Sequence, residues 1–181
     1  MTPMPLTITA AAREMGLDAQ AIARLRDDMT ERAAVRALLD HGDVGGALRM
    51  GLRLMPRGYV VPWLCQCVRS EAPEGDVLDG LLVAEAWLRE RIEPRRRSAL
   101  AFAAERHYVG TGALVAASAG WSEGFQLDGE GREVAPVAAQ LMAVVAAAAL
   151  LSLASTFIDF DARSRAFVAS AMALLPPEDS A

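Results

Sequence analysis

Two cysteines separated by a single residue are the first feature of the sequence that could support metal or redox chemistry. Cys65 and Cys67 lie in the stretch YVVPWLCQCVRS, residues 59–70, which resembles the inside of a helix. On an α-helix, residues two positions apart point about 200° away from each other, because each residue turns by about 100°. The two thiols therefore cannot share a metal ion or form a disulfide without breaking the helix. We predict two core cysteines, no metal site and no cofactor.

The histidines also lack the neighbours that catalysis needs. His41 and His107 are the only two in the chain, and each falls near an expected helix end. Asp43, two residues after His41, is expected to cap the next helix. The serines occupy no nucleophile-elbow setting, and the glycines form no phosphate loop. The sequence therefore predicts no catalytic residue, which favours a non-catalytic protein while the question of enzymatic activity stays open.

One carboxylate falls on an apolar helix face. On a helical wheel, Glu85 lies among the leucines of DVLDGLLVAEAWLRER, residues 76–91. An unpaired buried carboxylate is costly, so Glu85 should have a partner. Arg69, at the end of the preceding expected helix, is the nearest candidate along the chain. We predict a largely buried Arg69–Glu85 ion pair, and the alternative is that Glu85 lines a ligand pocket.

Five arginines crowd the corner between two expected helices. They are Arg89, Arg91, Arg95, Arg96 and Arg97, with Glu90 and Glu93 among them. The last three arginines fall in the first turn of a helix, where positive charge opposes the helix dipole. A solvated corner is one interpretation, and a surface that attracts an anionic partner is the other. Arg95, Arg96 and Arg97 are therefore candidate interaction residues.

Two aromatic residues lie in the one long segment without a helical pattern, residues 121–136. Trp121 and Phe125 are either pinned to the core or form an exposed binding hot spot, so both are candidate interaction residues. In the same segment, Asp128-Gly129 could turn a small β-hairpin between residues 125–127 and 132–134.

The rest of the chain has helical periodicity and predicts an all-α fold. The longest apolar run, residues 137–154, is rich in alanine and has acidic flanks, so we expect a buried central helix over residues 137–155 rather than a membrane span. Most other helices should contact it. We predict a single domain, residues 30–175, of stacked antiparallel helical hairpins around this helix. A helical extension, residues 1–29, precedes it, and a polar tail, residues 176–181, follows.

Composition narrows the range of partners. Of 181 residues, 53% are hydrophobic and 6% aromatic, which favours packed helices over a β-sandwich. Every basic residue is an arginine, a bias that we attribute to a GC-rich bacterial genome, and the net charge of −5 argues against nucleic-acid binding. The N-terminus lacks the pattern of a secretory signal. We therefore expect a cytoplasmic protein that binds no nucleic acid and has no membrane span.

Several short motifs, taken in order, resemble a known family. They are Trp63, Cys67-Val68-Arg69, Ala84-Glu85-Ala86-Trp87, an alanine-rich helix that begins with arginines, and Trp121-Ser122. In this order they resemble an uncharacterised bacterial protein family often encoded among type VI secretion genes. The likeness covers about residues 34–175. It implies an accessory protein that acts through protein contacts, and it assigns no catalytic residue.

Two functional hypotheses follow from these observations. The preferred one is a non-catalytic interaction or adaptor protein of the bacterial cytoplasm, accessory to a type VI secretion system. The alternative is a protein that binds a small ligand or an anion, with weak enzymatic chemistry at most. It would use the Arg95–Arg97 corner or a pocket around Arg69 and Glu85. A protein partner or a homodimer fits the preferred hypothesis.

Overall fold

The computed structural model describes residues 6–138 and 140–177 and confirms the predicted mostly helical fold. The helices are α1 (Ile8–Glu14), α2 (Ala19–Ile22), α3 (Glu31–Asp40), α4 (Val44–Leu54), α5 (Arg57–Ser70), α6 (Gly75–Arg89), α7 (Glu93–Glu105), α8 (Thr111–Gly120), α9 (Leu141–Ala154) and α10 (Phe160–Ala173). The strands β1 (Phe125–Leu127) and β2 (Glu133–Pro136) pair antiparallel and form the predicted hairpin. We refer to this two-stranded unit as the hairpin.

Short polar side chains set where several helices begin. The Asp43 carboxylate accepts a hydrogen bond from the Gly46 amide at 2.7 Å and starts α4, as its position after His41 predicted. Such a cap satisfies one of the backbone amides that have no partner within the helix. Four other helices begin in the same way: α1 at Thr7, α2 at Asp18, α3 at Thr30 and α10 at Asp159.

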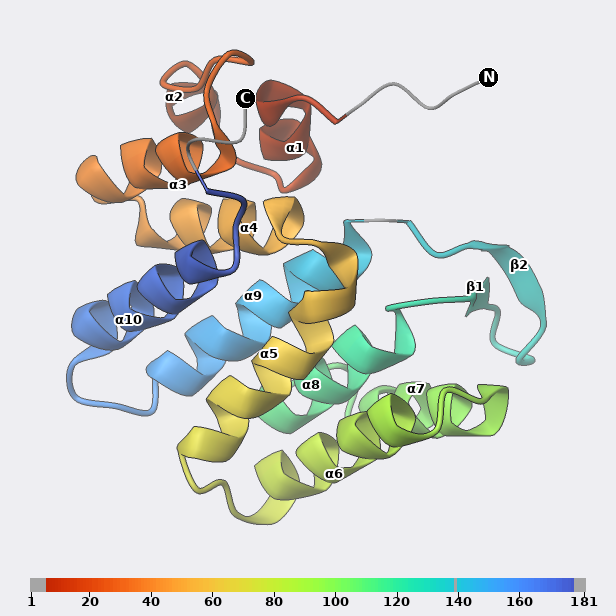
Figure 1. The fold of residues 1–181 in the computed structure, drawn as a ribbon. Helices are drawn as coiled ribbons and strands as arrows, with labels where there is room; N and C mark the ends of the chain where they lie inside the picture. The colour runs from red at the N-terminus through yellow and green to blue at the C-terminus, as the bar shows by residue number, and fades with distance from the viewer. Residues whose placement is uncertain (1–5, 139, 178–181) are drawn as a thin grey trace.

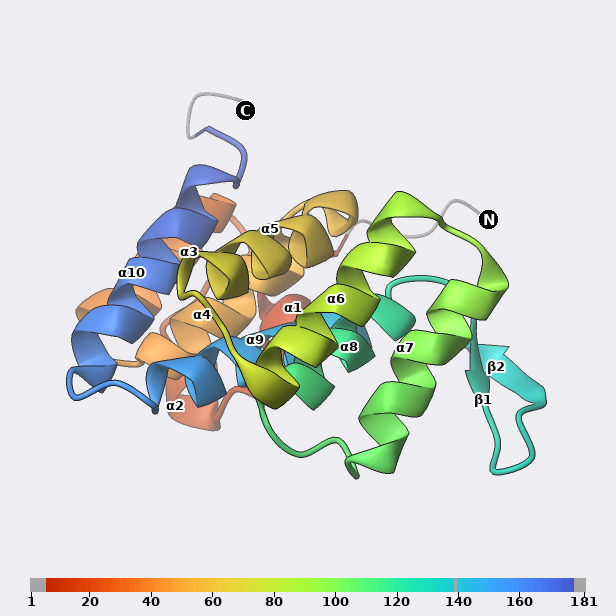
Figure 2. The ribbon, with the colours of Figure 1, turned by 90° about the horizontal axis from the view of Figure 1, so that it is seen from below.

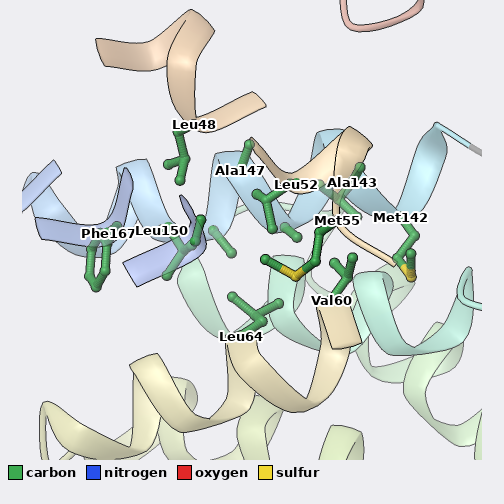
Figure 3. Packing of buried hydrophobic residues seen from close by; sticks show 14 of the residues in the cluster. Leu48, Leu52, Met55, Val60, Leu64, Met142, Ala143, Ala147, Leu150 and Phe167 are labelled. Atoms are coloured by element: carbon green, nitrogen blue, oxygen red, sulfur yellow. The ribbon is translucent and has the colours of Figure 1, made fainter. Parts of the chain in front are cut away.

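The interior is built on two helices, α8 and α9, rather than on the apolar helix alone. Helix α9 lies in the middle of the molecule and packs on α4, α5, α8 and α10 (Figure 1). Leu52, Val60 and Leu150 meet in this core, from α4, α5 and α9 (Figure 3). The expected stacking around the apolar helix is found for α4, α5, α8 and α10, whereas α6 and α7 pack chiefly on α8. Helix α9 also begins at Leu141, later than the predicted residue 137.

Helices α6 and α8 approach each other closely at two glycines. A Cβ added to Gly80 would overlap the carbonyl oxygen of Gly112, and one added to Gly112 would overlap the carbonyl oxygen of Asp76. The backbones can therefore touch only because both positions lack a side chain. This contact places α8 and the chain that follows it, including the hairpin, next to α6 and α7.

The N-terminal extension shares the main core. Helix α1 packs on α4, and the buried Ala11 and Met15 belong to the same hydrophobic cluster as the rest of the interior. Of the predicted extension and polar tail, residues 1–5 and 178–181 lie outside the described residues. In the part of the chain that the structure describes, no helix is both long enough and apolar enough to cross a membrane.

Candidate functional site

The two cysteines lie on α5, as predicted, and point into different surroundings. Cys65 is buried, Cys67 is half-buried, and both are free thiols. Burial raises the pKa of each thiol to about 12, so neither is a thiolate at neutral pH. Among residues 6–138 and 140–177, no three His, Cys, Asp or Glu side chains gather where they could hold a metal ion.

Arg69 and Glu85 form the predicted pair. Arg69 Nε and Nη2 donate to the two Glu85 carboxylate oxygens at 3.2 and 2.6 Å. The expectation that the pair is largely buried is wrong, because the side chains are 46% and 24% exposed. The buried face of α6 runs through Leu81, Ala84 and Trp87 and leaves Glu85 at its edge. An open depression of about 400 Å³ borders the pair.

This exposure predicts a small coupling energy. A double-mutant cycle of Arg69→Ala and Glu85→Ala, followed by urea denaturation, should give about 0.5–1 kcal/mol, since water screens a half-exposed pair even with two hydrogen bonds. The cost of 3–5 kcal/mol that accompanies a broken buried pair is not expected. A coupling energy above about 2 kcal/mol would show that the pair is desolvated in solution, contrary to its exposure here.

Other residues of the sequence motifs also form hydrogen bonds between distant segments. The Trp87 indole donates to the Ser122 hydroxyl at 3.0 Å, and Arg57 Nε donates to the Ser122 carbonyl oxygen at 2.9 Å. Trp63 likewise donates to Ser170 of α10 at 3.0 Å. These contacts join helices to each other, so the motifs describe the frame of the molecule rather than its binding surface.

Arg96 lies inside the protein, with only 1% of its surface exposed. Its Nε and Nη2 atoms each donate to Glu93 at 2.7 Å. Its Nη1 atom donates to the carbonyl oxygens of Gly120 and Phe125 at 3.1 Å each. A solvated corner is therefore the wrong expectation at this position, because the chain after α8 folds back over α7 and replaces water around the guanidinium.

Arg96 joins the start of α7, the end of α8 and the start of β1. Gly124 passes beside it with a φ of +79°, and a Cβ at that position would lie 2.9 Å from Arg96 Cζ. Only glycine combines that backbone conformation with so close an approach. Arg96 therefore fixes the base of the hairpin to two helices.

The neighbouring arginines stay at the surface and are paired. Arg95 Nε contacts Glu90 at 2.9 Å, and Arg97 Nε contacts Glu93 at 2.9 Å. Arg97 Nη1 also donates to the Gly131 carbonyl oxygen at 3.2 Å, which links α7 to the far end of the hairpin. The predicted cluster of arginines therefore does not form one surface. Arg96 is enclosed and has a structural role, and Arg97 faces the space between α7 and the hairpin.

That space is a groove of about 510 Å³, which we call the α7–hairpin groove. Helix α7 supplies one stripe of side chains at helical spacing, and the hairpin and the ends of neighbouring helices supply the rest. The lining residues are Arg97, Leu100, Ala101, Ala104, Tyr108, Trp121, Gln126, Asp128, Gly129, Gly131 and Leu141. The groove is thus mainly apolar, with polar groups toward the hairpin.

Two stacked aromatic rings line the groove. The Tyr108 and Trp121 ring centroids are 5.1 Å apart, with 12° between the ring planes. Trp121 is half-buried and packs on the core, which is the first of the two predicted alternatives. Phe125 is exposed, which is the second. His107 and Tyr108 both have left-handed backbone, with φ of 53° and 58°, which costs roughly 1–2 kcal/mol per non-glycine residue. This strained turn accompanies the placement of the Tyr108 ring on Trp121.

Charges around the groove are neutralised in pairs. Hydrogen bonds from Arg96, and then from Arg97, lower the pKa of Glu93. Hydrogen bonds from the Arg132 amide and guanidinium lower the pKa of Asp128. Both acids therefore stay ionised at neutral pH, and an arginine faces each one. The groove offers no strong net field, so its binding capacity rests on its apolar and aromatic surface.

The sequence did not indicate Leu100, Tyr108, Gln126 or the hairpin wall as site residues. Ala101 and Ala104 lie on the exposed side of an alanine-rich helix, which resembles any solvated helix face, and Leu100 is buried beneath them. The aromatic Tyr108 follows His107 without the glycine that usually marks a left-handed helix end. Arg97 and Trp121 were the groove residues that the sequence indicated, as two separate candidate interaction residues.

Comparison with known proteins identifies a family but no described function. Residues 34–175 match the model of a family described as "Family of unknown function (DUF6931)". No curated protein and no solved structure matches the chain.

Proposed function

The chain belongs to this family of unknown function, DUF6931, and we propose that it acts as a non-catalytic interaction protein that binds a segment of a partner protein in the α7–hairpin groove. The single observation that carries the proposal is the groove itself: an open, mainly apolar channel beside a stacked Tyr108–Trp121 pair. Grooves of this composition bind apolar side chains of peptide segments, and aromatic residues are enriched at such contacts.

The shape of the groove favours an apolar segment. Ala101 and Ala104 are exposed on α7 and leave room above the helix, while Leu100 closes the floor. Gln126 of β1 lies on the hairpin side and supplies a polar group for a peptide backbone. A partner segment would thus place one or two apolar side chains over the alanines and its backbone along the hairpin.

The anion-binding alternative has less support. Arg95 and Arg97 already contact Glu90 and Glu93, and Arg96 is enclosed. An anion would have to share each exposed guanidinium with a carboxylate that already neutralises its charge. The depression beside Arg69 and Glu85 has the same difficulty, because the guanidinium and the carboxylate satisfy each other with two hydrogen bonds.

The cellular setting is part of the proposal. We propose that the protein works in the bacterial cytoplasm as an adaptor, and that its partner belongs to a type VI secretion system. The support is the resemblance of the motifs described above, together with a groove suited to protein contacts. The groove-binding proposal does not depend on this setting.

Site-specific photo-crosslinking in the host cell tests the groove. A photoreactive residue at position 104 should give one discrete adduct with another protein, and the same residue at the exposed position 79 of α6 should not. Adding Ala101→Trp, which fills the groove, should abolish the adduct from position 104. Asp79→Trp is the matched control, since it adds the same ring on another surface.

Two results would contradict the proposal. One is an adduct from position 104 that persists unchanged with Ala101→Trp. The other is the absence of any adduct from positions 101 and 104 when exposed positions elsewhere capture a partner.

A further inference from the structure

Helices α5 and α6 pack side by side and run in opposite directions (Figure 2). Two neighbouring depressions follow the pair, and Pro62 of α5 and Leu88 of α6 border both of them. The first, of about 170 Å³, lies where α5 begins and α6 ends. The second, of about 400 Å³, is the one beside Arg69 and Glu85. We call the two depressions together the α5–α6 furrow.

The end of the furrow at the start of α5 has an excess of positive charge. Its charged lining residues are Arg57, Arg91 and Glu123. Arg91 Nη1 contacts a Glu123 carboxylate oxygen at 2.7 Å, so these two charges neutralise each other. Arg57 Nε donates to the Ser122 carbonyl oxygen at 2.9 Å, and in the described part of the chain Arg57 pairs with no carboxylate. One guanidinium charge therefore stays uncompensated, although the chain as a whole has a net charge of −5.

The backbone beside Arg57 supplies further donors. Within the residues that the structure describes, no side chain caps α5, so the Arg57 and Gly58 amides have no partner inside the helix. Gly58 also lines the 170 Å³ space, and a Cβ added there would meet no atom within 4 Å. This turn is therefore open to a ligand. Guanidinium groups and helix amides are donors that bind carboxylates and phosphates in proteins.

Apolar side chains in the same space select the kind of anion. Val61, Pro62 and Leu88 line it together with the charged groups. An inorganic phosphate has no apolar part to cover them, whereas a carboxylate beside an aliphatic side chain does. The volume is well below the range of about 300–1,000 Å³ that is typical of sites for drug-sized ligands, so it fits a single amino-acid residue.

The furrow continues beyond the space for this one residue. Past Pro62 and Leu88 it opens into the 400 Å³ depression, which Arg69 and Glu85 border. Their side chains satisfy each other with two hydrogen bonds, so this part favours neutral peptide groups over a second anion. A ligand that fills the furrow thus has one carboxylate at its end and an uncharged chain behind it, which describes the C-terminus of a polypeptide.

We propose that the α5–α6 furrow binds the C-terminal segment of a partner protein whose last residue is aliphatic. The terminal carboxylate contacts Arg57 and the first amides of α5, and the last side chain lies against Pro62 and Leu88. The single negative charge matches the one uncompensated guanidinium, and capture of a terminal carboxylate by backbone amides is a recurring mode of peptide recognition. The proposal does not rest on the α7–hairpin groove, since the two surfaces share no described lining residue.

Titration of the full chain with three acetylated tripeptides tests the furrow. Each tripeptide has two alanines followed by leucine, isoleucine or valine with a free carboxylate. At least one should bind with a Kd of about 1 mM or lower and shift the Arg57 and Gly58 amide signals in nitrogen-15 NMR spectra. Its C-terminal amide form should bind at least about tenfold more weakly, because an uncharged acceptor forms weaker hydrogen bonds with a guanidinium.

Replacement of Arg57 tests the contact with the carboxylate. Arg57→Met should weaken binding of the acid form by about tenfold or more and leave the amide form unaffected, whereas Arg57→Lys, which keeps the charge, should lose less. Arg95→Met is the matched control, because it removes another exposed arginine that lies outside the furrow, and it should leave the Kd unchanged. Ala101→Trp, which fills the α7–hairpin groove, should leave the Kd unchanged as well.

Several outcomes would overturn the proposal. One is that none of the three acids shifts the Arg57 and Gly58 signals at about 10 mM. Another is an equal Kd for the acid and amide forms, or a Kd that Arg57→Met does not change in a protein whose NMR spectrum shows the native fold. Acetate that binds as tightly as the tripeptides would identify an adventitious ion only. Loss of binding in Ala101→Trp would place the peptide in the α7–hairpin groove instead, which separates a failure of the furrow from a failure of the groove.

Discussion

Replacing Arg96 with methionine is expected to lower the free energy of unfolding by about 3–4 kcal/mol. The guanidinium is enclosed and donates four hydrogen bonds, two to Glu93 and one each to the Gly120 and Phe125 carbonyl oxygens. Methionine fills much of the same volume but donates none of them. The two carbonyl oxygens then lose a charged donor, while Glu93, which is partly exposed, recovers some hydration.

The adjacent arginine provides a matched control. Arg95 is on the same turn of α7 and makes one exposed ion pair with Glu90. Within residues 6–138 and 140–177, it donates no hydrogen bond to the hairpin or to α8. Arg95→Met should therefore cost less than about 1 kcal/mol. Urea denaturation of both variants measures the difference. Equal losses in the two variants would contradict the structural role assigned to Arg96.

The pH dependence of the Arg96→Met effect adds a specific signature. Arg96 lowers the pKa of Glu93, so the ion pair stabilises the folded state above the unfolded pKa and is lost as the pH falls through the folded pKa. In Arg96→Met the pKa of Glu93 should rise toward its ordinary value. The stability difference between wild type and variant should consequently narrow in acid. A simple packing defect would not produce this narrowing.

Replacing Gly80 with alanine is expected to destabilise the protein by about 3 kcal/mol or more. The new methyl group would overlap the Gly112 carbonyl oxygen, a backbone atom that cannot move aside like a flexible side chain. Helices α6 and α8 must then separate, which loosens the packing that holds α8 in the core. The intrinsic helix preference of alanine over glycine, about 1 kcal/mol, opposes this loss only in part.

Gly58 on α5 is the control for that experiment. An added Cβ there meets no atom within 4 Å, so Gly58→Ala should leave stability unchanged or raise it by up to about 1 kcal/mol. Thermal and urea denaturation of both variants gives the comparison. A Gly80→Ala protein as stable as wild type would show that α6 and α8 do not touch as described.

Much of the fold follows from local patterns in the sequence. The helix starts at Thr30 and Asp43, the hairpin around Asp128-Gly129, and the placement of both cysteines on one helix all depend on neighbouring residues. The Arg69–Glu85 pair could also be predicted, because the helix order brings the two residues together. The exposure of this pair could not be predicted, because it depends on which side of α6 packs against α8.

The site depends on contacts between distant segments, which local patterns do not describe. Arg96 reads as a surface residue among five arginines, and it is buried only because the carbonyl groups of Gly120 and Phe125 fold over it. Two consecutive left-handed residues, His107 and Tyr108, accompany the Tyr108–Trp121 stack, and no residue type at those positions indicates this unfavourable conformation. The sequence identified Trp121 and Arg97 as candidates, and tertiary structure alone unites them in one groove.

The central claim is that Arg96 fixes the hairpin to α7 and so preforms the groove. Hydrogen–deuterium exchange of residues 124–137 tests it most directly, with wild type, Arg95→Met and Arg96→Met compared under native conditions. The Asp128 and Val137 amides, which donate to the Arg132 and Gly124 carbonyl oxygens, should be protected in wild type and in Arg95→Met. In Arg96→Met they should exchange at least about tenfold faster while amides of α3 and α4 keep their protection. Hairpin amides that exchange as slowly in Arg96→Met as in wild type would contradict the claim.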